Sequence, residues 1–176
     1  MLEKFRTYLL MISFLVIAGG LMLYIYVLAK GDGEAFGGIK GTLQPTDFTS
    51  LTYAVGDSGY LMCSLSLCAA ADADADAEPF NLSASKLRQI LADYADTSPA
   101  VSIHDFDFRN NQYDFVERLP GQTFPNVISV RVIANTDYTS RLAYYSYRPV
   151  GSSDAEDHRQ NAARWIAELH SIAKDQ

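Results

Sequence analysis

Residues 126–134, "NVISVRVIA", and residues 141–149, "RLAYYSYRP", decide the fold of this chain. Both stretches are rich in β-branched and aromatic residues, which favour strands. The loop between them contains "NTDYT", a polar composition that is typical of a connection between strands. We therefore predict two strands of an antiparallel sheet here.

The segments on either side complete the predicted sheet and its helices. Residues 101–119, "VSIHDFDFRNNQYDFVERL", alternate in polarity on both sides of Asn110-Asn111, which predicts a β-hairpin, since Asn tolerates left-handed turn conformations. Helical spacing precedes it in residues 81–96, with Ser83 as the N-cap. The order helix, four strands, helix predicts an α+β domain with an antiparallel four-stranded sheet and flanking helices.

The C-terminal helix is predicted over residues 152–174. Ser153 and Glu156 have the spacing of a capping box at its start. Its apolar positions recur with helical period and should face the sheet; they are His158, Ala162, Trp165, Ile166, Leu169 and Ile172.

An N-terminal transmembrane helix is predicted before this domain. Residues 7–29 carry no charged side chain, and about 23 residues of helix cross a bilayer core of about 30 Å. Lys4 and Arg6 precede the run, so the positive-inside rule puts residues 1–6 in the cytoplasm. The expected organisation is an anchor at 7–29, a glycine-rich tether at 30–46 and a periplasmic α+β domain at 47–176, in a single-pass protein of a bacterial inner membrane. A signal peptide cleaved near Ala29 is the alternative.

Composition limits the partners of the chain. Its 176 residues carry a formal net charge of −7, which disfavours nucleic acid because binding to phosphates relies on Lys and Arg. The run "DADAD" at 72–76 lacks the Gly and the closing Glu of an EF-hand, so we expect a solvated acidic loop. Cys63 and Cys68 are candidates for a disulfide, with buried free thiols as the alternative. No metal and no cofactor is predicted.

The stretch "GDSGY", residues 56–60, resembles the surroundings of a catalytic serine. All three histidines, however, follow Ser58, whereas chymotrypsin-like enzymes place the base before the serine. The chain also lacks the alternation of strands and helices on which α/β-hydrolases build their nucleophile elbow. We interpret Gly56 to Gly59 as a turn that delivers Tyr60 to the core.

Short matches over residues 47–172 resemble a bacterial domain-of-unknown-function family, number fourteen-ninety-nine, in its membrane-anchored proteobacterial form. The matching motifs are Phe124-Pro125-Asn126 before "VISVRV", Tyr145-Ser146, Gly151-Ser152-Ser153-Asp154, Arg159, Trp165, Tyr60-Leu61 and Leu67-Cys68. The chain departs from the family at residues 155–159, "AEDHR", where only Arg159 agrees, and Arg148 stands alone in place of repeated Ser-Arg pairs. The resemblance implies no activity.

Two functions remain open from the sequence. The first is a non-enzymatic interaction module, an accessory or assembly subunit that binds a membrane or periplasmic protein, anchored to the lipid bilayer by its N-terminal helix. Its candidate contact residues are Tyr145, Arg148, Ser153, Asp154, His158 and Arg159. The second is a small envelope hydrolase in which Ser58 or Ser153 works with His158. We also expect the acidic neighbours of His158 to favour its protonation.

Overall fold

The computed structural model describes residues 2–30, 43 and 45–174. The chain divides into two compact units, Met1–Gln44 and Pro45–Gln176. The predicted tether, residues 30–46, falls mostly outside the described residues.

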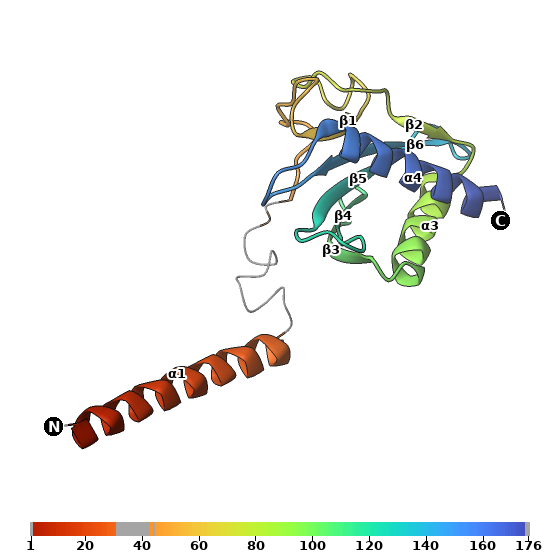
Figure 1. Cartoon of the computed structure of the whole chain (residues 1–176). Helices are drawn as coiled ribbons and strands as arrows, with labels where there is room; N and C mark the ends of the chain where they lie inside the picture. The colour runs from red at the N-terminus through yellow and green to blue at the C-terminus, as the bar shows by residue number, and fades with distance from the viewer. Residues whose placement is uncertain (1, 31–42, 44, 175–176) are drawn as a thin grey trace. The chain divides into compact units, whose positions relative to one another are not determined.

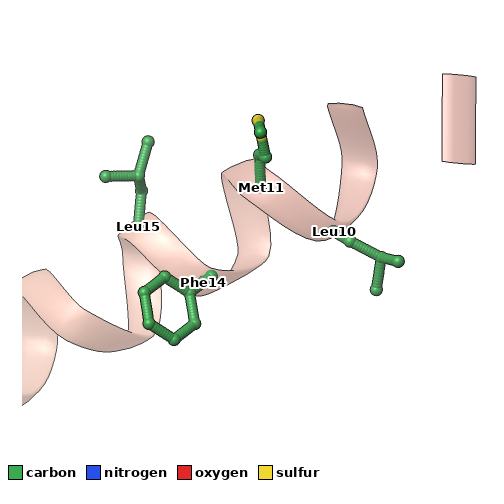
Figure 2. Close-up of a pocket in the computed structure, with 4 residues that line it drawn as sticks. All are labelled: Leu10, Met11, Phe14 and Leu15. Carbon is green, nitrogen blue, oxygen red and sulfur yellow. The ribbon is translucent and has the colours of Figure 1, made fainter. Parts of the chain in front are cut away.

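The first unit contains helix α1 (Leu2–Lys30). Leu10, Met11, Phe14 and Leu15 surround a shallow concavity on its surface and are exposed (Figure 2). In the part of the chain that the structure describes, no helix has the combined length and apolarity that crossing a bilayer requires.

The predicted transmembrane anchor is therefore wrong, and so is the single-pass inner-membrane location with its periplasmic domain. The lipid contact and the orientation of the N-terminus rested on the same anchor, and they lose their support with it.

The second unit is α+β, but its sheet has six strands, so the prediction of four was wrong (Figure 1). The strands are β1 (Gly59–Met62), β2 (Glu78–Phe80), β3 (Val101–Asp107), β4 (Gln112–Glu117), β5 (Asn126–Ala134) and β6 (Ser140–Tyr147). The order is β1-β6-β5-β4-β3, every pair is antiparallel, and β2 joins the same edge of β6 as β1. Strands as short as β1 and β2 lack a clear period in the sequence and depend on pairing with β6.

Two helices, α3 (Ala84–Thr97) and α4 (Ala155–Lys174), pack against one face of this sheet (Figure 1). Ser83 caps α3 by accepting a hydrogen bond from the backbone of Lys86, as predicted. The cap of α4 is Asp154 rather than Ser153, because the Asp154 carboxylate accepts a 2.6 Å bond from the backbone of Glu156. A carboxylate at this place also interacts favourably with the positive end of the helix dipole.

The core between helices and sheet is aromatic. Trp165 of α4 is fully buried, and its ring centroid lies 4.7 Å from that of Tyr94 in α3 and 5.2 Å from that of Phe115 in β4. This side of the sheet also buries Leu87, Ile90, Leu91, Ile128, Val130, Leu142, Tyr144 and Leu169. Ile166 and Ile172, which the predicted stripe included, are only half-buried.

An irregular layer, residues 45–58 and 63–77, covers part of the other face. Phe48, Tyr53 and Leu61 form a second buried cluster there with Cys63 and Cys68. The two cysteines form a disulfide with their Cα atoms 6.1 Å apart. The pairing is possible because the chain turns between them, where the backbone of Cys68 bonds to Ser64.

The acidic loop belongs to this layer and is solvated only in part, since Asp72 and Asp76 are exposed as predicted. Ala71 and Ala77 are buried. The carboxylate of Asp74 accepts hydrogen bonds from the Tyr53 hydroxyl at 2.6 Å and from the Leu61 backbone at 2.9 Å. The alternating alanines turn inward, and Asp74 between them finds two donors that satisfy it.

Candidate functional site

Ser58 lies exposed in the turn that leads into β1. Gly56 has a φ of 98°, and the backbone of Asp57 donates to Ala54. Tyr60, the first residue after Gly59, packs half-buried beside the helix-side core. The interpretation of Gly56 to Gly59 as a structural turn is confirmed.

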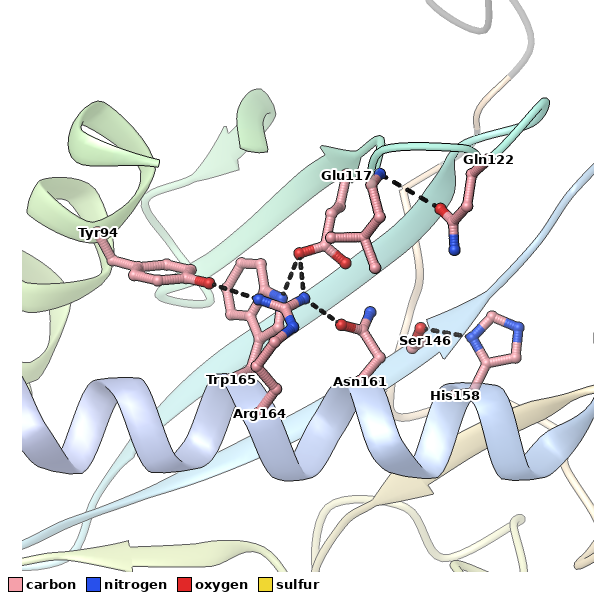
Figure 3. Close-up of polar contacts among 9 residues, drawn as sticks. Tyr94, Glu117, Gln122, Ser146, His158, Asn161, Arg164 and Trp165 are labelled. Atoms are coloured by element: carbon pink, nitrogen blue, oxygen red, sulfur yellow. Dashed lines mark hydrogen bonds and ion pairs between the residues drawn. The ribbon is translucent and has the colours of Figure 1, made fainter. Parts of the chain in front are cut away.

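His158 is fully buried under the first turn of α4, where its Nδ1 lies 2.8 Å from the Ser146 hydroxyl of β6 (Figure 3). Burial lowers the pKa of this imidazole, and the positive charge of Arg148 lowers it further. Asp157 and Asp154 act in the opposite direction but do not prevail. The expectation that acidic neighbours favour protonation was therefore wrong, because the loss of water outweighs them.

The serine beside His158 is thus Ser146, which stood out in the sequence only as part of the Tyr145-Ser146 match and not as a partner of His158. Neither Ser58 nor Ser153 forms a hydrogen bond with a histidine in the part of the chain that the structure describes. In a serine-hydrolase triad the serine bonds to Nε2 and a carboxylate orients Nδ1. Here the serine occupies Nδ1, and Nε2 of His158 has no partner among the described residues. Both side chains are 0% exposed, so a substrate does not reach them.

A second polar cluster lies one to two turns further along α4 (Figure 3). The carboxylate of Glu117, at the end of β4, is fully buried. Its Oε1 accepts hydrogen bonds from Arg164 at 2.5 Å and from the Trp165 indole at 2.9 Å. Arg164 also donates to the Tyr94 hydroxyl at 3.0 Å and contacts Asn161. These bonds neutralise one carboxylate and tie α4 to both α3 and the sheet.

The remaining predicted residues divide between the interior and the surface. Tyr145 is half-buried against the outer layer, with Tyr53 at 5.8 Å and Tyr147 at 5.2 Å between ring centroids. Burial raises the pKa of Tyr145 to about 12. Tyr145 thus belongs to the packing of the outer layer rather than to a free surface.

Arg148 holds the loop between β6 and α4 in place. Its Nε donates to the Asn126 side chain at 3.1 Å, and its Nη1 donates to the Ser152 carbonyl at 2.8 Å. Gly151 in this loop has a φ of 87°, a left-handed conformation that favours glycine. A Cβ atom there would lie 2.7 Å from the Phe124 ring, so Phe124 sits directly on the glycine backbone.

The resulting surface combines exposed apolar groups with acidic ones. We define the corner surface as loop 148–154, the Phe124 ring seated on it and the first turn of α4. Phe124 is 42% exposed and Val150 is 49% exposed. Asp154 and Asp157 are exposed at its edge, whereas Arg159 forms an ion pair with Glu156 at 2.5 Å.

The described residues contain no group of three or more His, Cys, Asp or Glu side chains that could hold a metal ion. No protein-family model, no curated protein and no solved structure matches this chain. The resemblance to the domain-of-unknown-function family therefore stays a prediction.

Proposed function

We propose that the chain is a non-enzymatic interaction module that binds another protein through the corner surface. The observation that carries this proposal is the seating of Phe124 on Gly151. An aromatic side chain fixed in an exposed position loses little conformational entropy on binding, which favours affinity. Aromatic anchors of this kind dominate the energetics of protein interfaces.

The rigidity of the loop supports the same proposal. Arg148 donates hydrogen bonds to Asn126 and Ser152, so its role is to hold the loop. Val150 is thereby presented outward on an ordered backbone. A surface that needs no rearrangement before contact avoids part of the ordering penalty of association.

The charges suggest the chemistry of the partner. Glu156 is already paired with Arg159, and Asp154 and Asp157 form no ion pair among the described residues. A net negative edge beside two apolar groups fits a partner that presents an apolar side chain flanked by Lys or Arg. The net charge of −7 for the whole chain likewise favours a positively charged partner and disfavours nucleic acid.

Nothing in the described geometry favours the hydrolase alternative. Among the described residues, the one hydrogen-bonded serine–histidine pair is sealed from solvent, and neither Ser58 nor Ser153 forms a hydrogen bond with a histidine. We therefore keep the binding function as the single proposal.

Photocrosslinking in intact cells tests it. The full chain would carry p-benzoylphenylalanine at position 150 of the corner surface, and crosslinked proteins would be identified by mass spectrometry. The matched control carries the same probe at position 108. Phe108 is 76% exposed and lies in the β3–β4 turn, at the opposite end of the sheet.

We expect a discrete crosslinked protein from position 150 and none from position 108. The Phe124→Ser variant should weaken this crosslink by removing the anchor, and the double variant Asp154→Asn, Asp157→Asn should weaken it in a salt-dependent manner. Equal crosslinking from positions 108 and 150 would remove the basis for assigning binding to the corner surface.

A further inference from the structure

We propose that the first turn of α4 is an acid-released latch, in which protonation of His158 frees the turn from β6 and disorders the corner surface. The proposal concerns regulation of the binding surface and rests, for its biological meaning, on the proposed function. It starts from an imidazole with 0% exposure whose one hydrogen bond goes to the Ser146 hydroxyl.

The geometry accommodates only the neutral ring. In a neutral imidazole one nitrogen donates and the other accepts. The contact of Nδ1 with Ser146 is compatible with either neutral tautomer, while Nε2 stays without a partner among the described residues in both. A charged ring presents two N–H donors, and Nε2 has no hydrogen-bond partner in the described part of the chain. An added proton would therefore place an unsatisfied positive charge in the protein interior, which is strongly unfavourable.

The groups that face His158 do not compensate this charge where it lies. From the end of β6 comes Arg148, a like charge. Tyr144 of β6 has a hydroxyl that is buried without a recorded partner, and burial raises the pKa of that hydroxyl, so it stays neutral. The nearest buried carboxylate along α4, that of Glu117, lies one to two turns away and is already bonded to Arg164 and Trp165 (Figure 3).

The other facing groups lie on α4 itself and on β1. Tyr60 lies on β1, the neighbour of β6 in the sheet, which also contacts α4, and it is neutral because burial raises the pKa of its hydroxyl. Asp154 and Asp157 attract a positive ring, but both are exposed. The attraction becomes effective when the ring leaves the interior, so a charged His158 favours an outward movement of the turn.

Movement of this turn reaches the corner surface directly. The backbone N–H of His158 bonds to the Asp154 carbonyl at 3.4 Å. Asp154 follows the loop segment whose Ser152 carbonyl is held by Arg148. Displacement of residues 154–158 therefore alters the loop on which Phe124 is seated. We expect binding at the corner surface to weaken in acid.

Two titrations on the same full chain test the latch. Nuclear magnetic resonance would follow the His158 ring and a 4-trifluoromethylphenylalanine placed at position 124, between about pH 7.5 and about pH 5. We expect the fluorine signal to change from one environment to another with the same midpoint as the ring titration. That midpoint should lie below the ordinary value of 6.5.

Variants locate the cause. His158→Asn keeps a polar atom near the Nδ1 position but cannot take up the proton, and its fluorine signal should be independent of pH. His170→Asn is the matched control, because His170 lies near the other end of α4, bonded to Glu78 at 2.8 Å. It should retain the wild-type transition.

The latch is overturned if the ring of His158 titrates while the fluorine signal stays constant, or if the transition persists in His158→Asn. The wild-type titrations decide the question even if that variant does not fold. They also need no partner: a missing crosslink from position 150 would reject the proposed function alone, and a constant fluorine signal would reject the latch alone.

Discussion

The indole of Trp165 donates a 2.9 Å hydrogen bond to the carboxylate of Glu117, and both side chains are 0% exposed. A carboxylate in the interior is unfavourable unless donors surround it. Here the indole and the Arg164 guanidinium both donate to Oε1, while Oε2 has no partner among the described residues. The contact joins the largest core residue to a buried carboxylate.

Replacing Glu117 with Ala should lower the free energy of unfolding by about 3–5 kcal/mol, because Arg164 and the indole lose the acceptor they share. Urea unfolding of the variant measures this. Glu156→Ala is the control, since it breaks an exposed Arg ion pair and should leave stability unchanged within error. Equal effects in the two variants would contradict a structural role for the buried carboxylate.

Replacing Trp165 with Ala should lower the free energy of unfolding by about 3–5 kcal/mol, as expected for a fully buried aromatic side chain. Phe108→Ala, at a position that is 76% exposed, provides the comparison. A loss below about 1 kcal/mol for Trp165→Ala would mean that α4 packs through another face.

Gly151→Ala should destabilise the loop for two reasons, the positive φ of 87° and the approach of the new Cβ to Phe124. Gly121→Ala separates them, because Gly121 has a similar φ of 84° but open space around it. We expect about 1 kcal/mol for Gly121→Ala and a clearly larger loss for Gly151→Ala. Should the two losses be equal, Phe124 is not seated as described.

The double variant Cys63→Ser, Cys68→Ser should lose about 2 kcal/mol, the value expected for a bridge that closes a short loop. Differential scanning calorimetry with and without reductant measures it. Reductant should lower the melting temperature of the wild-type chain and leave the double variant unaffected. An unchanged wild-type melting temperature would show that the outer layer holds without the bridge.

Stability should fall as the pH drops below 6.5, because the pKa of His158 is lowered in the folded chain. Between the folded and the unfolded pKa the unfolded chain binds more protons, so acid favours unfolding in this window. Thermal melts at closely spaced pH values measure the slope. The His158→Asn variant should show a weaker dependence of melting temperature on pH. If the variant shows the same dependence as the wild type, other titratable groups cause it.

The helix-side core is the part of the fold that the sequence predicts well. The spacing of Leu87, Ile90, Leu91 and Tyr94 indicates one apolar face of α3, and all four residues are buried. Asn111, which the predicted hairpin turn required, has a φ of 51°. These features depend on interactions between residues that are close in the sequence, and such interactions are visible in the spacing of apolar and turn-forming residues.

The same local reasoning failed where distant segments meet. β1 and β2 are strands because β6 pairs with both. The acidic loop is ordered because Tyr53, 21 residues away, donates to Asp74. His158 is neutral because β6 removes it from water, which its acidic neighbours in sequence do not reveal.

The sequence by itself determined the α+β class, the four longer strands and the faces of α3 and α4, because period and capping act over a few residues. Only the tertiary structure decided which serine meets His158, which donors neutralise Glu117 and that Phe124 rests on Gly151. Each of these contacts joins positions on different elements, and the energy that fixes them comes from excluding water between surfaces that meet only after folding.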